Sequence, residues 1–262
     1  MPSPISHVQL RVADLERSLT FYRDLLGFCL VRDDGRTLHL APRDPGPGTR
    51  DDAALLTLRE VSGLRRRPHQ PQTAGLYHVA WLVPSRVELG HALVGLAAAR
   101  YPLTGAADHA VSESLYLDDP DGNGVEIYAD RPREQWRWAD GRVHMTVDPL
   151  DTDAILRAVL ASGVVVTPES KWKGLPAGTE IGHVHFTVPD IGQAVAVGQK
   201  ELGMDVTFVM STLVGLSVER YHHHVNLNTW AGEGAPDDDP ASAGLDSWTF
   251  RGRLLAGYLS AG

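Results

Sequence analysis

The sequence predicts an α+β fold built from tandem βαβββ modules, and three observations support this prediction. A strand-like segment that leads into an Asp-capped helix occurs twice, as ISHVQLRVAD at residues 5–14 and as IGHVHFTVPD at residues 181–190. Each helix is followed by short strand-like runs between Gly, Pro and Asp. The same order begins again at residue 75. Internal repetition of this kind indicates the architecture better than any single strand does.

The first module shows the pattern most fully. Residues 5–12 alternate in polarity as a strand does, Asp14 offers a helix N-cap, and Gly27 ends the helix. Strands are expected next at residues 28–32, 37–41 and 53–58, with a Pro/Gly/Asp-rich loop at 42–52.

The later modules repeat this order. The second has a strand at 76–83, a helix at 87–99 and strands at 106–111, 114–117 and 124–128. The third has strands at 181–187, 206–210, 214–219 and 223–227, with a helix at 191–202. A fourth begins near residue 245, where only a strand and a short helix fit. We therefore expect a paired N-terminal domain at 1–132, a connector at 133–180 and an incomplete C-terminal domain at 181–262. The connector contains a strand-like run at 143–147 and a helix from about 151 to 161.

Composition and net charge narrow the classes of protein to which the chain can belong. The net charge of −9 argues against nucleic-acid or anionic-membrane partners, which need clustered Lys and Arg. A single cysteine excludes an internal disulfide framework. The sequence has neither a long apolar run nor a charged-then-apolar leader, so we expect a cytoplasmic protein.

The repeat resembles the vicinal oxygen chelate superfamily, which includes glyoxalase I, bleomycin-resistance proteins and type I extradiol ring-cleavage dioxygenases. The resemblance is strongest in residues 5–28, 75–132 and 181–232. DHAVSESLYLDDPDGNGVEIYADRP and YHHHVNLNTWAG are most similar to two-domain bacterial catechol-2,3-dioxygenase-type proteins. The resemblance implies paired modules that close into half-barrel metal cups. It does not fix the reaction.

The resemblance also implies a metal site. His7, His78 and Glu126 stand at the superfamily's ligand positions, in the first strands of modules one and two and the last strand of module two. Glu126 alternates with Val125 and Ile127, so its side chain points to the opposite face from theirs. Two imidazoles and one carboxylate suit Fe(II), with Mn(II) as the alternative.

The implied activity is extradiol cleavage of a catechol-like diol by O₂. His109 matches a histidine of the family's substrate and O₂ pocket, and Tyr116 matches a tyrosine that hydrogen-bonds the bound substrate oxygen. Two alternatives stay open, a glyoxalase-type isomerase or lyase and a non-catalytic antibiotic-binding protein. His109 and Tyr116 favour the dioxygenase over the isomerase, and a complete ligand set disfavours the binding protein.

Several features depart from the dioxygenase pattern. Residues 50–56 lack the usual pocket histidine, so either Asp51 or Asp52 takes over a proton-transfer role or the chemistry differs. Glu60 lies near the glyoxalases' fourth ligand position, which keeps the isomerase open.

Module four has Asp246 where a histidine is expected, and it has no closing glutamate. We therefore expect the working metal in the N-terminal domain. His183 and residues 222–224 are left as a relic, an entrance lining or a second metal site. An incomplete half-barrel exposes a sheet edge, so we also expect a homo-oligomer.

Overall fold

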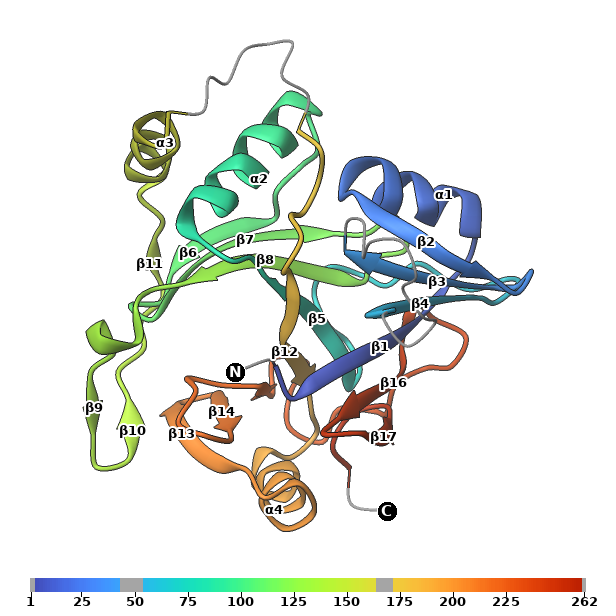
Figure 1. Ribbon diagram of the computed structural model, residues 1–262. Helices are drawn as coiled ribbons and strands as arrows, with labels where there is room; N and C mark the ends of the chain where they lie inside the picture. Colours follow the sequence, from blue (N-terminus) through green and yellow to red (C-terminus); the bar gives the residue numbers. More distant parts are fainter. Residues whose placement is uncertain (1–2, 43–53, 164–171, 261–262) are drawn as a thin grey trace.

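The computed structural model describes residues 3–42, 54–163 and 172–260, and it confirms an α+β fold of two large sheets with helices packed against them (Figure 1). One sheet is built from the two ends of the chain. Its strands are β1 (Ile5–Val12), β2 (Phe28–Asp33), β3 (Thr37–Pro42), β4 (Leu56–Glu60), β16 (Gly244–Phe250) and β17 (Arg253–Ala256). They lie in the order β17-β16-β1-β4-β3-β2.

The middle of the chain forms the larger sheet. Its strands are β5 (Gly75–Leu82), β6 (Gly105–Asp108), β7 (Ser112–Asp118), β8 (Gly124–Asp130), β11 (Asp148–Pro149), β12 (Glu180–Thr187), β13 (Asp205–Met210), β14 (Leu213–Ser217) and β15 (Val225–Asn228). They lie in the order β11-β6-β7-β8-β5-β12-β15-β14-β13.

The helices predicted for modules one to three and for the connector form at the predicted places. They are α1 (Leu15–Leu19), which continues as a π-helical turn (Thr20–Leu25), α2 (Arg86–Ala98), α3 (Thr152–Ala161) and α4 (Ile191–Leu202). Asp14 caps α1 by accepting the Arg17 N–H at 2.9 Å, and Asp190 caps α4 by accepting the Gln193 N–H at 2.9 Å. A 3₁₀ turn (Arg133–Gln135) and a small hairpin of β9 (Trp138–Ala139) and β10 (Arg142–Val143) occupy the connector. Of the strand expected at 143–147, only the first residue, Val143, lies in a strand, which is β10.

The modules pair differently from the expected arrangement. Module one shares its sheet with the fourth module, through antiparallel β1 and β16, and module two shares its sheet with module three, through antiparallel β5 and β12. The pairing of modules one and two within residues 1–132 is thus corrected. Modules with nearly the same strand pattern offer equivalent edges, so sequence pattern alone does not choose among partners.

The fourth module also ends differently from the expected strand and short helix. After β16, Arg251 and Gly252 adopt positive φ angles of 47° and 78°, and the chain turns back into β17. Two residues with positive φ make the type of hairpin turn that matches strand twist. β17 is therefore an edge strand, on which Leu254 is 69% exposed. The homo-oligomer stays a prediction.

An apolar core joins the two sheets. Phe28 of β2 packs edge-on against Trp81 of β5 with ring centroids 4.9 Å apart, and Phe186 of β12 packs on Trp248 of β16 at 5.7 Å. Val79 and Trp81 face this core, so the neighbouring side chains His78 and Ala80 face the other side of the nine-stranded sheet. The alternation expected around Glu126 is confirmed, because Val125 and Ile127 are core residues.

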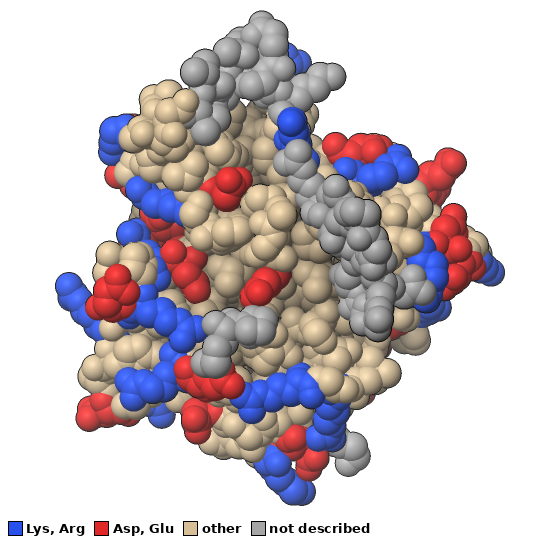
Figure 2. Space-filling view, in the orientation of Figure 1, with Lys and Arg blue, Asp and Glu red and all other residues tan. Residues whose placement is uncertain are grey.

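Charged side chains on the face in Figure 2 are interspersed by sign and gather toward its rim. No helix among the described residues has both the length and the apolar character that a membrane span requires. The absence of nucleic-acid and membrane partners stays a prediction.

Asp119 joins modules one and two through a buried set of hydrogen bonds. Its carboxylate accepts the N–H groups of Asp121 and Asn123, both at 2.8 Å, the side-chain amide of Asn123 at 2.9 Å, and the Tyr22 hydroxyl at 3.0 Å. Asp119→Ala should lower the free energy of unfolding by about 3 kcal/mol, because several buried donors lose their acceptor. Tyr22→Phe should cost about 1 kcal/mol. Urea unfolding checks both values, with exposed Glu233→Ala as the control. Equal losses in Asp119→Ala and the control would contradict this account.

Candidate metal centre

Three neighbouring strands bring ligand-type side chains to one face of the nine-stranded sheet. β5 and β8 are parallel, with Ala80 opposite Glu126. β5 and β12 are antiparallel, with Ala80 opposite His183 and His78 opposite His185. The small side chain of Ala80 therefore lies between Glu126 and His183, and His78 stands two residues away on the same strand.

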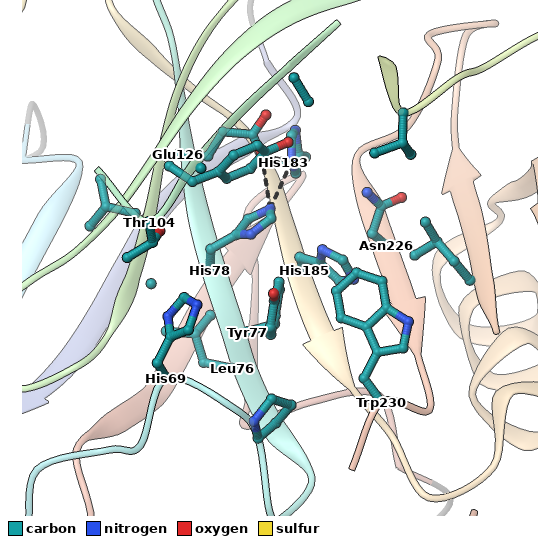
Figure 3. Close-up of a pocket in the computed structure, with 18 of the residues that line it drawn as sticks. His69, Leu76, Tyr77, His78, Thr104, Glu126, His183, His185, Asn226 and Trp230 are labelled. Carbon is teal, nitrogen blue, oxygen red and sulfur yellow. Dashed lines mark hydrogen bonds and ion pairs between the residues drawn. The ribbon is translucent and has the colours of Figure 1, made fainter. Parts of the chain in front are cut away.

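Three donor atoms converge there (Figure 3). Glu126 Oε2 lies 2.9 Å from His78 Nε2 and 3.0 Å from His183 Nε2, and the two Nε2 atoms are 3.3 Å apart. Adjacent ligands of an octahedral ion with bonds of about 2.1 Å lie about 3.0 Å apart. The three atoms therefore match one triangular face of an octahedron. The side chains are 7%, 3% and 2% exposed for His78, Glu126 and His183.

The charge states also suit a cation. Burial acts to raise the pKa of Glu126, but its interactions with His183 and His78 outweigh burial and leave this pKa well below the usual value. Burial lowers the pKa of His183 to about 4, although the Glu126 carboxylate opposes the shift. A carboxylate and neutral imidazoles are the forms in which these groups bind metals.

The sequence-predicted ligands are only partly brought together. His78 and Glu126 meet, whereas His7 lies on β1 in the other sheet, where its Nε2 is 2.7 Å from Thr57 Oγ1. The third ligand-type group beside His78 and Glu126 is His183, and these three form the metal-compatible cluster among the described residues. His183 and not His7 lies beside His78 and Glu126 because β5 pairs with β12 and not with β1. A sequence signal existed, because His183 stands in IGHVHFTV where His7 stands in ISHVQLRV.

His109 and Tyr116 lie together in the same cavity. Tyr116 is directly opposite Glu126 in the β7–β8 pairing. Its hydroxyl is 2.6 Å from His109 Nε2, and His109 Nδ1 is 2.8 Å from the Thr146 carbonyl. Because a carbonyl only accepts, Nδ1 carries the proton and Nε2 accepts from the phenol. Burial, and then the Glu126 charge, raise the pKa of Tyr116 well above the usual value, so the phenol keeps its proton.

The cavity itself has a volume of about 280 Å³, toward the small end of ligand pockets. Tyr77, His185 and Trp230 form one aromatic wall, with ring centroids 4.8–5.3 Å apart in each pair. Met145, Thr146 and Val147 of the connector also line it. Such edge-to-face aromatic walls suit a flat ring.

His223 is a further cavity residue, which the sequence reasoning did not assign. Its Nδ1 is 2.8 Å from His222 Nδ1, and His222 Nε2 is 2.8 Å from Asp130 Oδ1. With His222 Nε2–H donating to the carboxylate, His222 Nδ1 accepts from His223 Nδ1–H. His223 Nε2 is then a lone-pair acceptor, and it is buried without a hydrogen-bond partner. The histidine run at 222–224 was noticed in the sequence. Which of its members lies at the cavity and which lies next to Asp130 follows only from the fold.

Glu60, which was also weighed in the sequence, lies elsewhere. Glu60 ends β4 in the six-stranded sheet, 3.9 Å from Arg36, so it does not join the cluster. Asp51 and Asp52 lie outside the described residues.

Comparison with known proteins places the chain in a family. The model of the Glyoxalase/Bleomycin resistance protein/Dioxygenase superfamily matches residues 4–127. Over 248 residues the chain is 38% identical to a catechol-2,3-dioxygenase of Bacillus subtilis (strain 168), covering 94% of this chain and 81% of the relative. The chain belongs to the glyoxalase/bleomycin resistance protein/dioxygenase superfamily.

Two solved structures share the fold. A putative dioxygenase from Bacillus subtilis aligns with 98% of this chain and 67% of its own, at 17% identity and a TM-score of 0.51. Glyoxalase I from Zea mays aligns with 92% of this chain and 71% of its own, at 15% identity and a TM-score of 0.50. At these identities the likeness concerns the fold alone.

The geometry of the cluster predicts which substitutions would remove a bound metal. His78→Ala, Glu126→Ala and His183→Ala should each weaken Fe(II) binding by at least about a hundredfold, since each removes one of three ligands. His7→Ala should retain metal, because His7 is in the other sheet. Anaerobic titration calorimetry and metal analysis check this. Loss of metal in His7→Ala together with retention in His183→Ala would restore the assignment made from sequence.

Proposed function

We propose that the protein is an extradiol dioxygenase, which cleaves a catechol-like aromatic diol with O₂ and uses Fe(II) in preference to Mn(II). The observation that carries the proposal is the triangle of His78 Nε2, His183 Nε2 and Glu126 Oε2 at a buried cavity. A facial set of two histidines and one carboxylate leaves the opposite positions open. The name of the Bacillus subtilis relative, catechol-2,3-dioxygenase, supports the same reaction class.

The residues present fit such an ion. His78, His183 and Glu126 would hold it, and bound Fe(II) supplies electron transfer between a chelated diol and O₂. The chain's own contribution is placement and proton handling. The aromatic wall of Tyr77, His185 and Trp230 holds a planar ring.

Three residues can handle protons or hydrogen bonds at the substrate. The Tyr116 hydroxyl gives its one proton to His109 Nε2, so its oxygen can accept a hydrogen bond from a diol hydroxyl beside Glu126. His109 Nε2 accepts from that hydroxyl and so orients it. His223 Nε2, an unpartnered acceptor, can take the proton of a diol hydroxyl, and Asp130 supports this through His222.

The other two candidate functions have less support. A glyoxalase-type reaction with a fourth protein ligand finds no candidate in Glu60, which lies in the other sheet. A purely binding role leaves the three converging donor atoms of the triad without a purpose.

Oxygen uptake tests the proposal directly. Protein loaded anaerobically with Fe(II) should consume one O₂ for each catechol whose aromatic absorbance is lost, and Mn(II)-loaded protein should be slower. An oxygen electrode and absorbance spectroscopy measure the two quantities. If Fe(II)-loaded protein consumed no O₂ with any catechol of a broad panel, the proposal would fail.

The assigned roles predict slow but metal-replete variants. Tyr116→Phe, His109→Gln and His223→Gln should each lower kcat by about 10²–10⁴-fold, the usual loss when a positioned proton-transfer group is removed. Metal content should stay at the wild-type level, because none of the three is a ligand. His91→Gln, on α2, is the matched control and should leave kcat unchanged. A wild-type kcat in Tyr116→Phe would remove that residue from the mechanism.

A further inference from the structure

The cavity has an apolar side that the metal cluster does not use. Its members come from the β13–β14 hairpin, the connector and the loop after β15, and they are Phe208, Met210, Leu213, Met145, Val147 and Trp230. Met210 and Leu213 face each other across the hairpin. A ring held at the triad would therefore direct a substituent on this side against hydrocarbon and aromatic surface.

Among the cavity-lining residues that the structure describes, the cationic side chains that could pair with an anionic substituent already have acidic partners. Arg67 has a side chain only 6% exposed, and its Nη1 is 2.9 Å from Asp238 Oδ1. Its guanidinium also donates to the Ala243 and Ala74 carbonyls. His69, at the mouth, lies 3.4 Å from Asp118 Oδ2.

His185, the histidine of the aromatic wall, accepts a hydrogen bond at Nε2. The backbone N–H of Trp230 donates to Asn228 Oδ1, so Asn228 Nδ2 faces His185 Nε2, at 2.8 Å, and donates to it. His185 Nε2 therefore offers no proton to an anionic substituent. The acid Asp118 also lines the cavity and would repel an anion.

We propose that the cavity selects diols whose ring substituent is uncharged and apolar, such as alkylcatechols, and rejects catechols that carry a carboxylate. This rests on the proposed function, because it assumes a catechol ring at the triad. A carboxylate held against this apolar side loses part of its water without finding a cation, and so it binds poorly. Val147 and Trp230 of this side are 67% and 45% exposed, so we expect a discrimination of about tenfold or more in Kd.

Anaerobic calorimetry on Fe(II)-loaded protein tests the selection without turnover. The probes are 3,4-dihydroxyphenylacetate, its methyl ester and 4-ethylcatechol, so that the acid and its ester differ mainly in charge. The ester and 4-ethylcatechol should bind at least about tenfold more tightly than the acid. Binding of the acid as tight as that of its ester would overturn the proposal.

A charge-introducing variant tests the cause. Leu213→Arg should tighten binding of the acid by at least about tenfold relative to Leu213→Gln, which has a polar but neutral side chain. Binding of 4-ethylcatechol should be equal in the two variants. Thermal melting verifies folding, and Met210→Arg against Met210→Gln repeats the test across the hairpin. If neither Arg variant gained affinity for the acid, the missing cation would not be the cause and the proposal would fall.

The two proposals fail separately. Preferred binding of neutral probes without O₂ consumption would refute the dioxygenase and keep the selection. Ring cleavage that is fastest with the acid would keep the dioxygenase and refute the selection.

Discussion

The antiparallel pairing of β5 with β12 is the contact on which the whole site depends. It puts His183 opposite Ala80 and diagonal to His78, while the parallel pairing of β5 with β8 supplies Glu126 from the other side. Side chains alternate between faces along a strand, so a slip of one residue would turn His183 into the core. A bulge at Gly182 lets Ile181 face the core although His183, two residues later, faces the cavity. A Cβ at Gly182 would lie 1.7 Å from the Tyr128 hydroxyl, so no larger residue fits there.

Local sequence was sufficient for most of the elements and for the faces of the strands, but it did not predict β17, where a short helix was expected. Capping aspartates, ending glycines and alternation around Glu126 are short-range signals, and they correctly predicted α1, α4 and the inward direction of the carboxylate. Which modules share a sheet is a long-range choice. ISHVQLRV and IGHVHFTV carry nearly the same pattern, so the sequence could not decide whether β1 or β12 lies beside β5.

The same distinction separates the site residues that were predicted from those that were missed. His78, His109, Tyr116 and Glu126 all belong to residues 75–132, one continuous module, and their mutual positions follow from its own turns and pairing. His183 and His223 come from the next module, so their approach to the cluster required knowledge of the β5–β12 pairing. His7 has a local hydrogen-bond partner in Thr57 of the neighbouring strand, which accounts for a polar side chain there without a metal.

Charge balance connects the metal cluster to the choice of substrate. A divalent cation held, as proposed, by the Glu126 carboxylate and two imidazoles would have a net charge of +1. A diol bound there after the loss of one proton would bring this to zero, so the centre would need no further counter-ion. A carboxylate elsewhere on the ring would add an uncompensated negative charge to a cavity in which Arg67 already pairs with Asp238. Burying such a charge is costly, whereas Met210, Leu213 and Trp230 gain contact with an apolar group. The proposed ligand set would thus also limit the charge that the rest of the substrate can carry.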